Sequence, residues 1–224
     1  LLAAGGVWSA GLLAGCGARA AAAPRVDVLA AGLATGPDTL HPYIDQTREG
    51  NFLKRNIFDA LFHTDGDTLA VGPGLAASWK EVNDLLLEAT LRSDATFHDG
   101  SPVTNADVAW TLNHIVEKGA SEGFAGASRF RWIARAEAVG ERGVRIISAR
   151  PTPIRLTRLA WMPILSRAAY ERQGRDGTAM LPMGSGPYRV ESHAPGQSIV
   201  LRRHAGYRGV KAGAVIDRID VRVV

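Results

Sequence analysis

The sequence predicts an α+β or mixed α/β fold, because helical and strand patterns occur along the chain without strict alternation. Leu53, Ile57 and Leu61 recur at the spacing of an amphipathic helix. In 85–92, the alternate residues Leu85, Leu87, Ala89 and Leu91 are all apolar. Alternate residues of a strand point to the same side, so this pattern is typical of a strand with one buried face. Charged residues make up 21% and hydrophobic residues 46% of the chain, which indicates an ordinary soluble globular protein.

The first half of the chain is predicted to run from a strand through a loop into a helix. The strand covers Arg25–Ala31, and the loop that follows contains the turn-forming sequence Gly36-Pro37-Asp38. The helix covers Gln46–Phe62. Thr64–Asp67 then forms a turn and leads through 72–79 into a pair of strands, of which the second is 85–92.

The second half contains the clearest helix start. Thr104 is the expected N-cap, with Asp107 at the third helical position, and Val108, Leu112 and Ile115 form the buried stripe. A loop follows over 119–129, and a short helix is expected over 168–173. The remaining predicted strands are 144–148, 188–192, 199–203 and 216–224.

The beginning of the chain has the pattern of an export leader. Leu1–Leu13 is apolar and has the length of a signal-peptide core, although the basic segment that normally precedes such a core is missing. Leu13-Ala14-Gly15-Cys16 then resembles a lipoprotein cleavage site, so Cys16, the single cysteine, is the expected lipidation site. The alternative is a plain secretory leader that is cleaved within Ala20–Ala23. Both interpretations predict export, and the missing basic segment indicates that the sequence is truncated at its start.

Charge and motifs argue against several classes of protein. The net charge of +4 comes from scattered arginines, and Arg202-Arg203 is more typical of a strand end than of a nucleic-acid interface. Gly184-Ser185-Gly186 lacks the Gly-x-Ser-x-Gly spacing of a hydrolase, and Gly72-Pro73-Gly74 leads into no phosphate-binding motif. The six histidines have no helical metal-ligand spacing, and an exposed turn explains His63–Asp67 better than a metal site.

Five segments resemble, in order and spacing, the extracellular solute-binding proteins of family 5, which serve bacterial peptide and nickel ABC importers. They are Asn56–Leu61, Leu75–Trp79, Phe97–Gly100 with the helix start after it, Gly184–Tyr188, and the closing Gly-Tyr and strand. The resemblance extends from about 26 to 224. These motifs are turns, caps and core aromatics, so they identify the scaffold and not a catalytic site.

The resemblance implies the first lobe of a two-lobed fold of the periplasmic-binding-protein type II kind, with the second lobe missing. The expected division is a leader over 1–23, the main part of the lobe over 24–62 and 166–224, and an inserted subdomain over 63–165. The final strand stops without a turn or cap, which indicates a fragment of a longer chain.

The function implied by the resemblance is capture of a small solute outside the cytoplasm and delivery to the permease of an ABC importer. A peptide is the first choice of solute, and nickel complexes, sugars and opines stay open. No cofactor, no metal and no nucleic-acid partner are expected, and the protein is expected to be a monomer on a lipid anchor at the periplasmic or cell surface. The alternatives are a domain that binds nothing and a serine-hydrolase-like enzyme.

Aromatic side chains suit a solute-binding cleft, because they offer apolar area with few rotatable bonds. The resemblance implies that the loop after the first strand and two aromatic segments lie near the cleft. The candidate ligand-binding residues are Thr35, Leu40, Tyr43, Trp132 and Trp161. The alternative for each aromatic residue is a place in the core.

Overall fold

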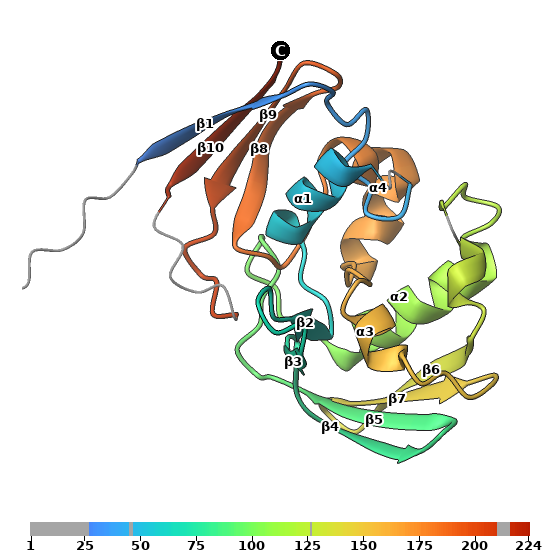
Figure 1. Ribbon diagram of the computed structural model, residues 1–224. Coiled ribbons are helices and arrows are strands. Elements are labelled where there is room, and N and C mark those ends of the chain that lie inside the picture. Colours follow the sequence, from blue (N-terminus) through green and yellow to red (C-terminus); the bar gives the residue numbers. More distant parts are fainter. Residues whose placement is uncertain (1–26, 45–46, 126, 210–215) are drawn as a thin grey trace, which may run out of the picture.

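The computed structural model describes residues 27–44, 47–125, 127–209 and 216–224 (Figure 1). The predicted leader, with the lipidation site Cys16, lies outside these ranges and stays a prediction. None of the helices in the described ranges has both the length and the apolar character needed to cross a membrane.

Strands and helices are mixed along the chain, as predicted. The strands are β1 Val28–Leu33, β2 Phe62–Thr64, β3 Val71–Pro73, β4 Ala76–Asn83, β5 Leu86–Leu91, β6 Ile133–Val139, β7 Gly143–Ser148, β8 Tyr188–Ala194, β9 Ser198–Arg203 and β10 Arg218–Val223. The helices are α1 Arg48–Ile57, α2 Asn105–Lys118, α3 Arg155–Leu159 and α4 Arg167–Met180, with a short 3-10 helix η1 at Ala127–Phe130. The predicted mixed α/β class is therefore confirmed.

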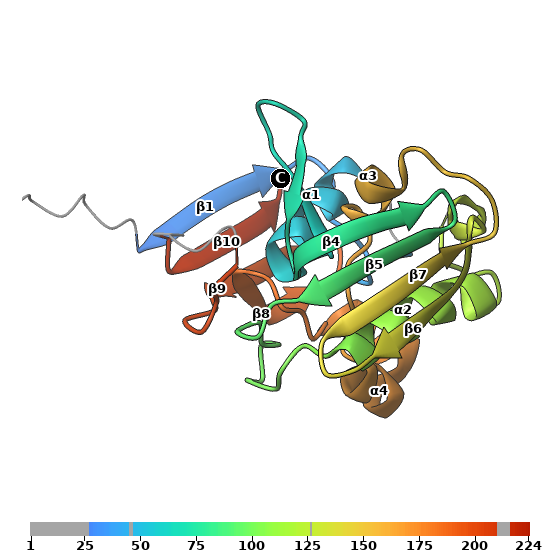
Figure 2. The same cartoon turned by 90° about the horizontal axis from the view of Figure 1, so that it is seen from below.

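Two four-stranded sheets lie at opposite sides of the helices (Figure 1). The first has the order β1-β10-β9-β8 and joins the two ends of the described chain, with β1 parallel to β10 and the other pairs antiparallel. The second has the order β4-β5-β7-β6, is antiparallel throughout and comes from the middle of the chain (Figure 2). β2 and β3 form a separate hairpin between them. The domain boundaries given above stay a prediction.

Helix α2 begins as the sequence predicts. The Thr104 hydroxyl oxygen accepts a hydrogen bond from the backbone N–H of Asp107, and the Asp107 carboxylate accepts one from the backbone N–H of Thr104. This reciprocal pair satisfies donors that the first helical turn leaves open. The other carboxylate oxygen of Asp107 accepts from the backbone N–H of Arg167, 2.9 Å away, so the same cap also fixes the start of α4.

Several elements differ from the prediction, among them the short strands β2 and β3, which were not predicted. Helix α1 ends at Ile57 rather than Phe62, because Phe58 is extended and the Ile57 carbonyl accepts a hydrogen bond from Gly186 across the fold. Helix α4 continues to Met180, past a break at Gly174. The φ of Gly174 is 69°, which is not helical and explains why the predicted helix ended at 173. Strand β6 was not predicted, because the apolar positions that alternate with Arg135 and Glu137 are alanines, which are depleted in strands.

Candidate ligand-binding site

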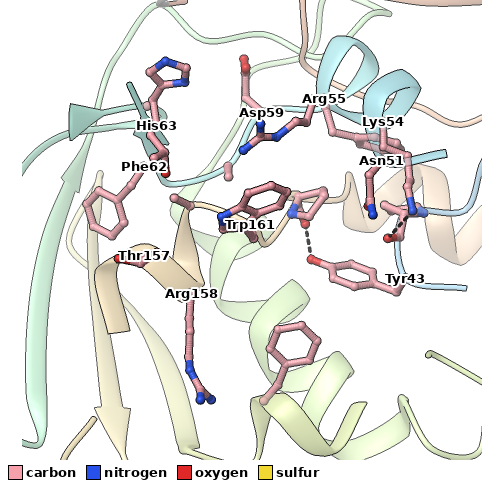
Figure 3. Close-up of a pocket in the computed structure, with 18 of the residues that line it drawn as sticks. Tyr43, Asn51, Lys54, Arg55, Asp59, Phe62, His63, Thr157, Arg158 and Trp161 are labelled. Carbon is pink, nitrogen blue, oxygen red and sulfur yellow. Dashed lines mark hydrogen bonds between the residues drawn. The ribbon is translucent and has the colours of Figure 1, made fainter. Parts of the chain in front are cut away.

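An open cavity of about 600 Å³ lies between α1, β2 and the segment that follows α3 (Figure 3). This volume is within the range of about 300–1,000 Å³ that small-molecule sites occupy. The side chains that line it include Tyr43, Asn51, Lys54, Arg55, Asp59, Phe62, His63, Phe130, Arg158 and Trp161. Because these come from segments far apart in the sequence, the cavity is a product of the tertiary fold.

Helix α1 forms one wall and is fixed at its start and along its inner face. The Thr47 hydroxyl oxygen accepts a hydrogen bond from the backbone N–H of Gly50 at 3.1 Å, which caps the helix. Leu53 and Ile57 are almost completely buried and pack into the core. The two basic residues between them are thereby held at the cavity.

The two basic residues of α1 occupy different environments. Lys54 is 3% exposed, and its ammonium lies 3.4 Å from the carbonyl oxygen of Pro42. Arg55 is exposed, and the central carbon of its guanidinium lies 3.8 Å from the ring centroid of Trp161, which is a cation–π contact (Figure 3). Partial burial lowers the pKa of Arg55 below its usual value.

The end of α1 is clamped by the Gly184-Ser185-Gly186 segment. The backbone N–H of Gly186 donates to the Ile57 carbonyl at 2.8 Å, and the Ser185 hydroxyl oxygen accepts from the backbone N–H of Asp59 at 3.3 Å. A Cβ atom on Gly184 would lie 2.0 Å from the carbonyl oxygen of Ile57. The motif that identifies the scaffold in the sequence is therefore the part that positions the α1 wall.

The segment after α3 adjoins α1 and completes this wall. The backbone N–H of Trp161 donates to the carbonyl of Arg158 at 3.1 Å, which continues the last turn of the helix. Pro163 forms an antiparallel bridge with Ala60, and its carbonyl accepts a hydrogen bond from the Tyr43 hydroxyl. Burial raises the pKa of Tyr43 well above its usual value, so the hydroxyl stays protonated as a donor.

The candidate residues predicted from the sequence fall into three groups. Tyr43 and Trp161 both line the cavity, Tyr43 as a buried support and Trp161 with 51% of its surface exposed. Leu40 and Trp132 are buried in the core at 0% and 1% exposure and do not line the cavity. Thr35 is exposed beside the first sheet, also away from the cavity.

The charged residues of the cavity were not predicted. Lys54, Arg55 and Asp59 line it, yet in the sequence they read as the polar face of an amphipathic helix and its end. One signal in the sequence could have pointed to Lys54 and Arg55. They directly precede Asn56–Leu61, a motif of the resembled family.

His98, in another scaffold motif, has a structural role. Its Nδ1 accepts a hydrogen bond from the backbone N–H of Gly184 at 3.3 Å, so its Nε2 donates to the carbonyl of Gly186 at 3.1 Å. Because both ring nitrogens bind backbone groups, His98 is not available as a base for the neighbouring Ser185, whose oxygen accepts from Asp59. The geometry gives no support to the hydrolase alternative.

This arrangement predicts acid sensitivity. Burial lowers the pKa of His98 from 6.5 to about 4, and burial with nearby Lys54 lowers the pKa of His41 to about 3. Between about pH 6.5 and 4 the unfolded chain binds a proton at His98 that the folded chain does not, so stability falls as the pH falls through this window and is unaffected above it. The His98 contribution is at most about 3 kcal/mol, at about 1.36 kcal/mol per pKa unit.

The measurement is urea unfolding at several pH values between 4.5 and 7.5. The variant His98→Gln keeps a donor and an acceptor but cannot be protonated, so we expect it to lose a large part of the pH dependence below 6.5. An unchanged slope in this variant would show that His98 is not the titrating group.

The fold and the open cavity define one lobe of a solute-binding protein. Residues 70–224 match the family model described as "Bacterial extracellular solute-binding proteins, family 5 Middle". The chain belongs to this family.

Several relatives with curated sequences are named as binding proteins, and they are much longer than this chain. A putative binding protein of Brucella melitensis is 38% identical over 128 residues, which are 55% of this chain and 20% of the relative. The peptidoglycan-binding protein YepA of Agrobacterium fabrum is 34% identical over 61% of this chain and 22% of its own length. The probable peptide-binding protein YejA of the same organism is 28% identical over 77% and 29%. The chain thus spans between a fifth and about three tenths of these relatives.

Solved structures share the fold over most of the chain. MoaA of A. tumefaciens R10, in complex with mannopinic acid, has a TM-score of 0.78 and 28% identity, and the match covers 89% of this chain and 41% of that one. The oligopeptide-binding protein AppA of Bacillus subtilis, in complex with a nonapeptide, has a TM-score of 0.80 and 20% identity over 89% and 40%. Coverage of about two fifths of each structure agrees with the predicted single lobe.

Proposed function

We propose that this protein is the solute-binding component of an ABC importer and that it captures peptides outside the cytoplasm. The observation that carries the proposal is the open cavity with the exposed Trp161 on its wall, in a lobe of family 5. A large aromatic face that is half exposed in a concave site is suited to stacking on a ligand. Peptides are the preferred cargo because two relatives are named as peptidoglycan-binding and peptide-binding proteins.

The mechanism would be capture of the solute on this wall, closure of a second lobe over it, and delivery to the permease. An exposed wall without a facing wall binds weakly, so closure would supply the remaining contacts and bury the solute. We further propose export and a lipid anchor at Cys16, from the leader pattern.

Nickel chelates are the alternative cargo within the family. In the ranges that the structure describes, no three His, Cys, Asp or Glu side chains come together as a metal site. The cavity therefore gives a peptide more support than a directly coordinated metal ion.

The test is thermal unfolding of the full-length protein with a panel of peptides and, in parallel, nickel–histidine. A ligand at a hundredfold excess over its dissociation constant stabilises the native state by about 2.7 kcal/mol, so we expect a clear rise in the melting temperature with a subset of peptides and no change in the peptides themselves. Product formation would instead support an enzyme. The absence of a shift with any peptide would contradict peptide capture.

A further inference from the structure

Two arginines come together at one corner of the cavity. Arg129 belongs to η1 and Arg158 to the short helix α3. The Arg158 guanidinium donates to the carbonyl oxygen of Arg129 at 2.9 Å, so the end of one side chain lies against the backbone of the other residue. Both residues line the cavity, and the Arg158 and Asp59 side chains point toward opposite ends of it (Figure 3).

These two positive charges have no counter-ion in the ranges that the structure describes. The bond to the Arg129 carbonyl is the one hydrogen bond that the Arg158 guanidinium makes there, and the Arg129 guanidinium makes none. Neither guanidinium forms an ion pair with a carboxylate of the described residues. Like charges at one place repel each other, and an anion bound between them relieves the repulsion.

We propose that this corner of the cavity is a subsite for a carboxylate of the solute, held by Arg129 and Arg158. The inference rests on the proposed function, since it names the chemical class of the peptide that the same cavity takes. Charge-assisted hydrogen bonds from a guanidinium to a carboxylate are among the strongest that proteins form. The single bond to the Arg129 carbonyl leaves most of the N–H donors of Arg158 for such a ligand.

The other charges of the cavity also favour an acidic solute. The described lining carries one carboxylate, that of Asp59, and four cationic side chains, which are those of Lys54, Arg55, Arg129 and Arg158. Asp59 accepts a hydrogen bond from the Tyr207 hydroxyl at 3.1 Å. An excess of positive charge in a concave site attracts anions and disfavours a basic group of the ligand beside the two arginines.

The experiment changes the charge of the ligand and of the protein in parallel. The probes are peptides on a tetra-alanine host in which each position in turn carries Glu, Gln or Lys, each made as the free acid and as the C-terminal amide. Calorimetry gives their dissociation constants for the full-length wild type, Arg129→Gln, Arg158→Lys and a double variant with both arginines changed to Gln. Arg142→Gln is the matched control, because it removes the same charge from the exposed turn between β6 and β7, outside the cavity.

For the wild type we expect the acidic member of at least one pair to bind about 10- to 100-fold tighter than its neutral partner. Arg129 is exposed, so this preference should shrink when the salt concentration rises from about 50 to about 500 mM. The double variant should lose most of the preference, the two single variants should keep part of it, and Arg142→Gln should keep all of it. Neutral peptides should bind all variants equally, which a mere distortion of the wall would not allow.

The outcomes separate the subsite from the proposed function. Equal affinities of the acidic and neutral probes would overturn the subsite and leave peptide capture intact. A preference for the acid that survives in the double variant would place the carboxylate at other groups, and an equal loss of acidic and neutral probes would give the two arginines a structural role; both results would overturn the inference. If no peptide of any charge bound, the proposed function itself would fail, and the inference with it.

Discussion

Replacing Trp161 with alanine is expected to weaken peptide binding by about 30-fold or more, since aromatic residues at the centre of a binding site commonly contribute at least about 2 kcal/mol. Trp161 is 51% exposed on the wall of the cavity, so its loss removes a contact surface rather than core packing. The same change removes the ring that Arg55 contacts. Calorimetric titration of the full-length variant with a peptide that binds the wild type is the measurement.

The control for this prediction is Trp110→Ala. Trp110 lies on α2, where it stacks on His114 and does not line the cavity. We expect this variant to lose stability but to keep its affinity within about twofold, measured where circular dichroism shows that both variants are folded. If Trp161→Ala unfolded the protein, or bound the peptide as tightly as the wild type, Trp161 would be a core residue or a bystander.

Replacing Gly184 with alanine is expected to destabilise the protein by about 3 kcal/mol or more. A Cβ atom at this position would lie 2.0 Å from the carbonyl oxygen of Ile57, which is a backbone atom at the end of α1 and cannot rotate away. Overpacking in a close-packed region usually costs about 1–3 kcal/mol, and here the obstacle is rigid. Urea unfolding measures the loss directly.

Gly72→Ala is the matched control for Gly184→Ala. Gly72 lies in β3, and a Cβ atom there would meet nothing within 4 Å, so the expected change is within about 0.5 kcal/mol. Equal stabilities of the two variants would mean that the Gly184 segment does not clamp α1. In that case the position of Arg55 and Asp59 would need another explanation.

The scaffold could be predicted from the sequence because its signals are local. The Thr104 cap, the alternation in 85–92 and the glycines of Gly184–Tyr188 each report on a few neighbouring residues, and each corresponds to a cap, a strand or a clamp in the structure. The strand at Ile133–Val139 was missed because the apolar positions between its charged residues are alanines, which are depleted in strands. The length of α1 was overestimated because its end is set by Gly186, far away in the chain.

The site could be predicted only in part, because the type of a residue does not reveal how deeply its side chain is buried. Trp132 and Trp161 are equally plausible ligand contacts in the sequence, yet one is 1% and the other 51% exposed. Arg55 lies over the ring of Trp161, and this contact follows from the way α1 and the segment after α3 meet. Such a contact has no signature in either segment alone.

The central claim is that this lobe binds a peptide on the wall formed by α1 and Trp161. The most direct measurement is a crystal structure of the full-length protein with a peptide that stabilises it. We expect the peptide to lie against the exposed part of Trp161, with a second lobe closed over it. A peptide bound elsewhere, with this wall open to solvent, would contradict the claim.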